Sequence, residues 1–270
     1  MEPTVNVFWL PKLGNAIEEY EDASAHSVPD RRFAVADGAT ESSFADLWAL
    51  SLVNKFTATP PPVTPPSTPF AGWVAPLQKE WHAQIDWDHL PWFAEEKARG
   101  GAFATFLGLI FSPDPKAEKP SFFGRMFGMF SAPKENHVTW QALAVGDSNL
   151  FLIRDNALLK AFPFVTAEQF NSRPLLLSSN PSFNSKVWAD VKFADGDCKP
   201  NDIFILATDA LAKWFLTECE ASRQPWRTLY ALKTDNDFEI FVAKLRKDSL
   251  IRNDDTTLVI FKWMEGSTAK

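Results

Sequence analysis

Four aspartates lie next to apolar segments of this chain, at positions where strands are expected to end. They are Asp37 after RFAVA, Asp147 between QALAV and LFLIR, Asp209 after DIFILAT, and Asp254 before TTLVIF. A single aspartate at a strand end costs little free energy when it faces solvent, and that explanation suits each one alone. Four in similar positions favour a functional explanation, because the ends of several strands can meet at one edge of a sheet assembly.

Carboxylates that meet at one edge repel each other unless they are protonated or neutralised by cations. Mg²⁺ and Mn²⁺ are the divalent ions best suited to oxygen ligands and water. Two such ions about 3.5–4 Å apart can hold a water molecule, lower its pKa and clamp a phosphoryl group for in-line attack. The four aspartates therefore predict a metal centre that hydrolyses phosphate esters.

Apolar runs and their periodicity predict the elements that must position these carboxylates. Strands are expected at residues 5–10, 32–36, 103–111, 138–145, 150–154, 175–178, 186–193, 202–208 and 256–263. Helices are expected at residues 42–56, 71–97 with an interruption around Pro91, 211–220, 225–232 and 237–246. Strands and helices that occur in separate blocks favour the α+β class, with a β-sandwich covered by helices.

Two irregular segments and one turn complete the predicted organisation of a single domain over residues 1–270. Residues 57–69 contain six prolines and predict an extended connector. Residues 112–136 form an insertion much longer than a hairpin loop, which predicts a docking element for a partner or else an insert packed on its own domain. The turn at 146–149, between two apolar strands, predicts a β-hairpin.

The composition limits the classes of function open to the chain. Its 270 residues are 46% hydrophobic and 23% charged, which is enough to bury a substantial core. A net charge of −7 opposes nucleic-acid binding. No apolar run approaches the roughly 18 residues of a transmembrane helix, and the two cysteines, Cys198 and Cys219, form no C-x-x-C pair. We therefore expect a cytoplasmic protein with no transmembrane segment and no nucleic-acid partner.

Six short motifs occur in order along the chain. They are residues 21–23 (EDA), 33–38 (FAVADG), 101–105 (GAFAT), 144–148 (AVGDS), 206–211 (LATDAL) and 254–259 (DDTTLV). Each is common by itself, but the ordered set resembles the metal-dependent protein serine/threonine phosphatases of type 2C over nearly the whole chain. The resemblance implies a central β-sandwich of two mainly antiparallel sheets flanked by helices. It also implies hydrolysis of phosphoserine and phosphothreonine on proteins by a metal-activated water.

The resemblance implies a role for each acidic residue of these motifs. Asp37 would bridge two Mg²⁺ or Mn²⁺ ions, with the backbone carbonyl of Gly38 as a further ligand. Asp209 and Asp254 would complete the site of the first ion. Asp37 and Asp209 are therefore the residues on which catalysis is expected to depend most directly.

The other acidic residues are implied to act at the edge of this centre. Glu21 and Asp22 would hold water molecules around the second ion, and Asp147 would form a weaker third metal site together with Asp209. Ser148 would shape the turn beside Asp147, because a water molecule rather than a serine is the implied nucleophile.

Four positions differ from the family's pattern. Ile17 stands where many members have a phosphate-binding arginine, and Lys12 is the nearest upstream cation. Ala210 replaces a glycine, which suits the turn only if that residue needs no positive φ. Asp255 replaces a common asparagine and adds negative charge, and Ala39 stands where some members have a histidine.

Two alternatives to a protein phosphatase stay open. The four departures also suit a regulatory or binding module of the same fold whose catalysis is weak or absent. A small-molecule phosphomonoesterase would use the same residues, and the sequence does not separate it from a protein phosphatase. The retained carboxylates favour an enzyme, because an acidic centre without cations to neutralise it destabilises the fold.

Overall fold

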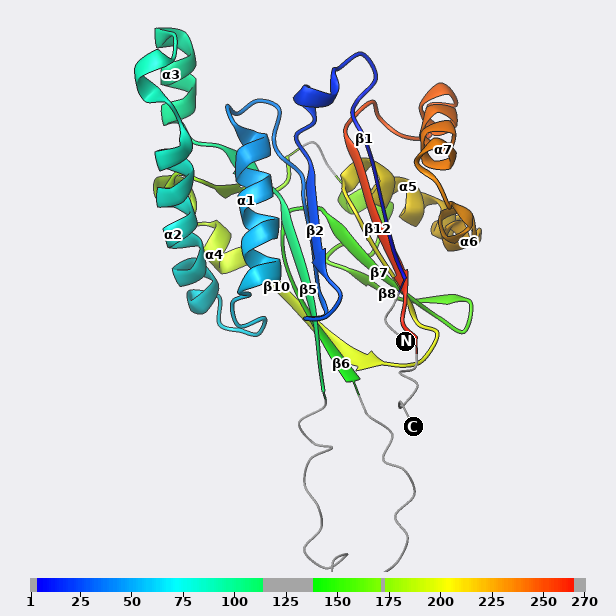
Figure 1. Cartoon of the computed structure of the whole chain (residues 1–270). Helices are drawn as coiled ribbons and strands as arrows, with labels where there is room; N and C mark the ends of the chain where they lie inside the picture. Colours follow the sequence, from blue (N-terminus) through cyan, green and yellow to red (C-terminus); the bar gives the residue numbers. More distant parts are fainter. Residues whose placement is uncertain (1–3, 114–137, 171–172, 265–270) are drawn as a thin grey trace, which may run out of the picture.

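The computed structural model describes residues 4–113, 138–170 and 173–264. Within them, two five-stranded antiparallel sheets pack face to face, and helices cover the outer face of each sheet (Figure 1). A separate pair of short strands, β4 (Phe103–Ala104) and β9 (Leu177–Ser178), forms a small third sheet. The predicted fold class, an α+β sandwich of two antiparallel sheets flanked by helices, is confirmed.

The first sheet has the strand order β1-β12-β11-β7-β8. Its strands are β1 (Val5–Leu10), β7 (Asn149–Arg154), β8 (Ala157–Phe162), β11 (Ile203–Ala207) and β12 (Thr256–Lys262). Ala207, the last residue of β11, pairs with Leu258 near the start of β12 and with Asn149 at the start of β7. The end of β11 and the starts of β12 and β7 therefore share one edge of this sheet.

The second sheet has the strand order β10-β6-β5-β3-β2. Its strands are β2 (Ala23–Ser27), β3 (Arg32–Ala36), β5 (Phe106–Pro113), β6 (Val138–Val145) and β10 (Lys192–Cys198). Ala36 at the end of β3 pairs with Ala23 at the start of β2, and Phe106 at the start of β5 pairs with Val145 at the end of β6. These four strand ends also share one edge.

Both faces of the central strands are buried, which explains why their sequences are continuous apolar runs rather than alternating patterns. In β11, Phe204 and Leu206 lie between the two sheets, whereas Ile205 points to the helical layer. Between the sheets the rings of Phe33 and Phe261 stack with their centroids 4.0 Å apart, so β3 of one sheet packs directly on β12 of the other.

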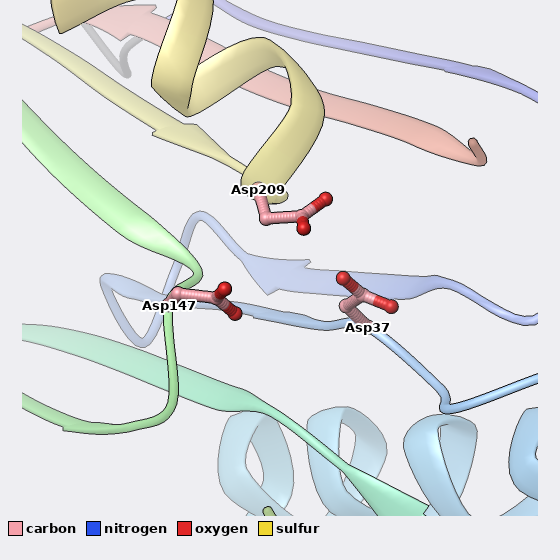
Figure 2. A group of neighbouring side chains, drawn as sticks. All are labelled: Asp37, Asp147 and Asp209. Carbon is pink, nitrogen blue, oxygen red and sulfur yellow. The ribbon is translucent and has the colours of Figure 1, made fainter. Parts of the chain in front are cut away.

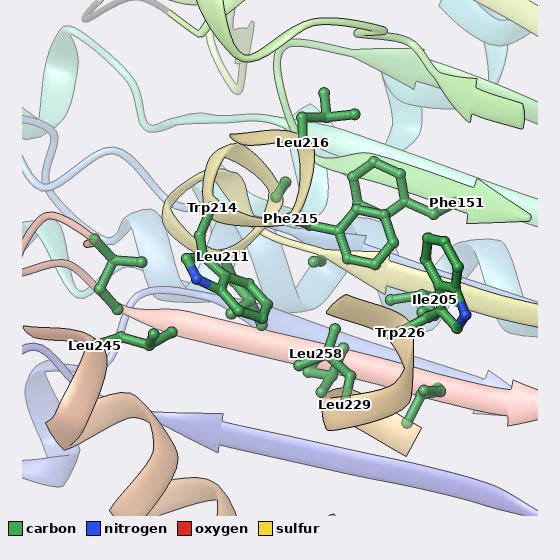
Figure 3. Packing of buried hydrophobic residues seen from close by; sticks show 14 of the residues in the cluster. Phe151, Ile205, Leu211, Trp214, Phe215, Leu216, Trp226, Leu229, Leu245 and Leu258 are labelled. Atoms are coloured by element: carbon green, nitrogen blue, oxygen red, sulfur yellow. The ribbon is translucent and has the colours of Figure 1, made fainter. Parts of the chain in front are cut away.

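The helices divide into two groups, one for each sheet (Figure 1). On the second sheet lie α1 (Ala45–Ala58), α2 (Thr68–Gln84) and α4 (Val187–Asp190), while α3 (Trp92–Arg99) lies beyond the end of α2 (Figure 1). On the first sheet lie α5 (Asp209–Glu220), α6 (Pro225–Ala231) and α7 (Asp235–Lys247). Figure 3 shows the packing of the helices on the first sheet, where Phe215 of α5 stacks on Phe151 of β7 with the ring centroids 4.0 Å apart. Burial of these aromatic rings fixes the position of α5, whose first residue is Asp209.

The predicted hairpin at 146–149 is wrong, because β6 belongs to the second sheet and β7 to the first. The turn instead carries the chain from one sheet to the other. Gly146 has a φ of +86°, and a Cβ there would lie 2.8 Å from the Thr105 side chain. A Gly-Asp turn indicates that the chain reverses locally, but it does not indicate which strands pair. After the turn, the Asn149 side chain anchors the start of β7 by two hydrogen bonds with the backbone of Phe164, both at 2.9 Å.

Other boundaries also differ from the sequence-based expectation. The helical region predicted over 71–97, with an interruption around Pro91, is α2 and α3 with a break between them. The predicted strand at 186–193, in contrast, is α4 followed by β10. The connector predicted over 57–69 is shorter in the structure and comprises residues 59–67, between the end of α1 and the start of α2. Pro69 belongs to α2 because proline is accepted in the first turn of a helix. From residue 114 on, the predicted insertion at 112–136 lies outside the described residues.

Candidate metal centre

Three of the four predicted aspartates meet at the shared edge of the two sheets. Asp37 follows β3, Asp147 lies in the crossing from β6 to β7, and Asp209 begins α5. One carboxylate oxygen from each lies within 4.8 Å of the other two, and Figure 2 shows the three side chains turned toward a common space. The sandwich thus brings together Asp37 and Asp147, which are 110 positions apart in the sequence, and Asp147 and Asp209, which are 62 apart.

Thr105 connects two of these aspartates through hydrogen bonds. Its backbone N–H donates to the carbonyl of Asp37 at 2.8 Å, and its hydroxyl accepts the N–H of Asp37 at 3.1 Å. The same hydroxyl is 2.7 Å from that of Ser148, the neighbour of Asp147. Thr105 belongs to the motif at residues 101–105, but no role was predicted for it from the sequence. Its hydrogen bond to Ser148 suits a residue that shapes the turn, which is the role expected of Ser148.

Gly38 allows the chain after Asp37 to approach the Glu21 segment closely. A Cβ on Gly38 would lie 2.5 Å from the carbonyl oxygen of Glu21 and 3.1 Å from the backbone of Ala45. Gly38 also forms an isolated β-bridge with Ala104. The absence of a side chain here thus sets the distance between the Asp37 segment and the Glu21–Asp22 segment.

Two of the three carboxylates are incompletely satisfied by donors of the described residues. Both side-chain oxygens of Asp147 and Oδ1 of Asp209 are buried without a hydrogen-bond partner there. Burial raises the pKa of all three groups, and the neighbouring carboxylates raise it further; Asp147 reaches about 7. Three neighbouring carboxylates, two of them with unpartnered buried oxygens, are a donor set that fits a hard divalent cation.

The fourth aspartate, Asp254, reaches the centre through an arginine that the sequence analysis missed. Arg252 donates from Nε to Oδ2 of Asp254 at 2.8 Å, and its Nη2 contacts Oδ2 of Asp209. Asp254 also raises the pKa of Asp37 and of Asp209, which places it near both. No sequence signal identified Arg252, because an ion pair between distant segments depends on the folded arrangement.

Asp22 and Glu21 lie on the side of the centre formed by the start of β2. Asp22 is buried, and its Oδ2 accepts hydrogen bonds from the hydroxyls of Thr208 and Thr257 at 2.9 and 2.7 Å, while Oδ1 has no partner among the described residues. Burial raises its pKa well above the usual value, and its charge in turn raises that of Asp37. The predicted set therefore gathers in one region, with Asp37, Asp147 and Asp209 closest together.

The structure also clarifies three of the departures from the family pattern. Ile17 is 65% exposed, so it presents no cation to the centre. Lys12 lies at its edge instead, with Nζ 3.6 Å from Oε2 of Glu21 and donating to the Thr40 hydroxyl at 2.9 Å. Ala210 lies inside α5 and is not among the residues with positive φ, so it meets the condition stated for that position.

Asp255 has a structural reason to be an aspartate. Its Oδ1 accepts the backbone N–H of Lys12 at 2.8 Å and its Oδ2 accepts that of Glu21 at 2.7 Å. An asparagine offers one carbonyl oxygen, so it would leave one of these N–H groups facing an NH₂ donor. The carboxylate therefore fixes both ends of the loop that leads to Asp22.

Replacing Asp255 with asparagine is expected to lower the free energy of unfolding by about 1 kcal/mol. One buried hydrogen bond is lost, and this cost is partly offset because the charge repulsion between Asp255 and Asp22 is removed. Chemical denaturation of the metal-free protein measures this loss. Asp195→Asn in β10, where the side chain is exposed, is the matched control. Equal stability of the two variants would contradict the assigned role of Asp255.

The metal-free protein is expected to lose stability as the pH rises from about 5 to about 8. Raised pKa values in Asp37, Asp147 and Asp209 mean that the folded protein binds these protons more tightly than the unfolded chain does, so deprotonation favours unfolding. Each group contributes up to about 1.4 kcal/mol per pH unit between its unfolded and folded pKa. Thermal unfolding in the presence of a chelator measures the trend; a melting temperature that rises with pH over this range would contradict it.

Comparison with solved structures identifies the fold as that of serine/threonine protein phosphatases. The Mycobacterium tuberculosis serine/threonine phosphatase PstP matches with a TM-score of 0.61 at 14% identity, over 98% of this chain and 100% of that one. The PstP catalytic domain in complex with two manganese ions gives 0.58 at 13% identity, over 98% and 99%. PppA of Pseudomonas aeruginosa, a regulatory component of its T6SS, gives 0.55 at 15% identity, over 97% and 99%. The fold predicted from the motif resemblance is confirmed.

Searches against family models and against curated proteins find no match to the sequence. Among the described residues, no helix is both long and apolar enough to span a membrane.

Proposed function

We propose that this protein is a Mg²⁺- or Mn²⁺-dependent phosphatase that hydrolyses phosphoserine and phosphothreonine on proteins. The observation that carries the proposal is the convergence of Asp37, Asp147 and Asp209 in a fold shared with serine/threonine phosphatases, with buried oxygens of Asp147 and Asp209 that have no hydrogen-bond partner among the described residues. Divalent cations held there would supply Lewis acidity toward the phosphate ester and activate a water for in-line attack.

The chain's own residues would divide the work of holding two cations, with a weaker third site. Asp37 is proposed as the bridging ligand, assisted by the carbonyl of Gly38, because it is the most central of the acidic groups. Asp209 and Asp254 are proposed for one ion, and Asp147 shares the third site with Asp209. Thr105 positions the backbone of Asp37 in this arrangement.

Glu21 and Asp22 are proposed to hold water around the second ion. Asp22 is suited to this because its Oδ2 is fixed by two threonine hydroxyls while Oδ1 remains free of partners within the described residues. A carboxylate oriented in this way can accept hydrogen bonds from ordered water without changing its own position. Lys12, beside Glu21, limits the negative charge on that side.

The test is hydrolysis of p-nitrophenyl phosphate and of phosphoserine and phosphothreonine peptides by the purified chain, with Mn²⁺, with Mg²⁺ and with a chelator. Turnover of the peptides that requires the metal supports a protein phosphatase. Turnover of p-nitrophenyl phosphate alone would favour the small-molecule phosphomonoesterase. A folded protein that hydrolyses none of these substrates with either metal would favour a binding or regulatory module. The ion pairs of Arg252 with Asp209 and Asp254 also suit such a module, because they occupy two of the proposed metal ligands.

Two further features remain proposals. Docking of a phosphoprotein or another partner through the 112–136 insertion rests on its Phe/Met-rich sequence alone. Cytoplasmic location rests on the cysteine content; Cys198 and Cys219 are both unpaired, and burial raises the pKa of each thiol.

A further inference from the structure

Arg252 binds two carboxylates of the centre at once. It lies in the loop between α7 and β12, two residues before Asp254. Its Nη2 contacts Oδ2 of Asp209 and its Nε donates to Oδ2 of Asp254 at 2.8 Å. The side chain of Arg252 is 50% exposed whereas that of Asp209 is 7% exposed, so the guanidinium reaches the buried carboxylate from the solvent side.

The charge of Arg252 acts on the whole centre. Its positive charge lowers the otherwise raised pKa of Asp147 and of Asp209. It does not satisfy every oxygen, because Oδ1 of Asp209 and both side-chain oxygens of Asp147 lack hydrogen-bond partners in the part of the chain that the structure describes. One guanidinium thus compensates part of the charge of four neighbouring aspartates, and the space between Asp37, Asp147 and Asp209 is left to another cation.

A divalent cation and this guanidinium compete for the same oxygens. If the cation takes both Asp209 and Asp254 as ligands, it needs carboxylate lone pairs at the position where Arg252 now binds. Two positive groups held by one pair of carboxylates in a partly buried site repel each other strongly. The guanidinium is attached to an exposed loop and has solvent on one side, so it can move away while the carboxylates stay.

We propose that Arg252 is an internal counter-cation of the acidic centre, which holds Asp209 and Asp254 together in the metal-free protein and is displaced when a divalent cation binds both. The inference rests on the proposed function, because it takes the centre to be a metal site. Arg252 then has two opposite effects: it stabilises the fold without metal and it weakens metal binding. A merely structural arginine would have the first effect only.

The test compares wild type with Arg252→Gln and Arg252→Lys by calorimetric titration with Mn²⁺ and by thermal unfolding in a chelator. Arg252→Gln is expected to bind Mn²⁺ about tenfold more tightly, the effect of losing a charge-assisted contact that the ion must replace. Its metal-free melting temperature is expected to fall. Arg252→Lys keeps a charge but not the fork that joins two carboxylates, so its Mn²⁺ affinity should lie between the other two.

Arg223→Gln is the matched control, because Arg223 is an exposed arginine whose Nε pairs with Glu218 at 2.7 Å. It should bind Mn²⁺ as wild type does. Unchanged or weaker Mn²⁺ binding by a folded Arg252→Gln would overturn the proposal, as would absence of binding in every variant. If Arg252→Gln does not fold without metal, Arg252→Lys decides by the same criterion.

The two failures are distinguishable because binding and turnover are measured separately. Wild type that binds Mn²⁺ but hydrolyses no phosphate ester would refute the proposed function and leave the Arg252 comparison valid. Wild type that hydrolyses phosphate esters with Mn²⁺, with equal Mn²⁺ affinity in Arg252→Gln, would refute the counter-cation alone.

Discussion

Replacing Asp37 or Asp209 with asparagine is expected to reduce Mn²⁺-dependent hydrolysis of p-nitrophenyl phosphate by more than about 100-fold. A neutral amide is a poorer ligand and does not offset the charge of a divalent cation, and even the loss of a residue that only orients a ligand costs about 10–100-fold. Both residues belong to the group of carboxylates within 4.8 Å of one another. Steady-state kinetics over a Mn²⁺ series measures the loss.

The Asp37→Asn substitution is expected to raise the stability of the metal-free protein although it lowers turnover. Without metal, removing one charge from a crowded centre relieves repulsion, so metal-free Asp37→Asn should melt higher than metal-free wild type. Asp195→Asn, at an exposed position of β10, should change neither turnover nor melting temperature. Near-wild-type turnover in Asp37→Asn or Asp209→Asn would show that the ligands are assigned incorrectly.

Replacing Gly38 with alanine is the second substitution with a large expected effect. The added methyl group would lie 2.5 Å from the carbonyl of Glu21, a backbone atom that can move only with its loop. We expect this displacement to cost about 1–3 kcal/mol of stability and to weaken Mn²⁺ binding about 10–100-fold. Calorimetric titration and chemical denaturation measure the two effects.

Gly72→Ala is the matched control for this substitution. Gly72 lies within α2, its φ is not positive, and a methyl group added there would meet no heavy atom within 4 Å outside its own helix backbone. Alanine is favoured over glycine inside a helix, so the control should be as stable as wild type or more stable. A Gly38→Ala protein that binds Mn²⁺ as well as Gly72→Ala does would show that the Glu21 loop adapts freely.

Three strands were predicted with their observed bounds. They are β1 (5–10), β3 (32–36) and β6 (138–145). β2 and β8 were missed, because ASAHS and ALLKAF lie at sheet edges, where partly exposed positions need not be apolar. β10 was misplaced for a similar reason: its sequence KFADGDC is mostly polar, and it forms the outer strand of its sheet.

The candidate site was predictable to the extent that it depends on strand ends. Asp37, Asp147 and Asp209 each adjoin a strong apolar strand, so the sequence alone indicated that they converge. The sequence did not indicate that Asp147 lies in a crossing between sheets, because turn residues do not specify which strands pair. It also gave no sign of Arg252 or of the two N–H groups that donate to Asp255, since those contacts join segments more than 40 residues apart.

The crossing at Asp147 has a consequence for how the whole molecule responds to its ions. Asp37 extends from one sheet, Asp209 follows a strand of the other, and Asp147 lies where the chain passes between them. Ions bound to these carboxylates would therefore link the two sheets and oppose any sliding of one sheet over the other. By linkage, any change that loosens the packing between the sheets, such as the loss of the Phe33–Phe261 stack, must also weaken ion binding. The affinity for ions would then depend on the packing of rings that are not themselves ligands.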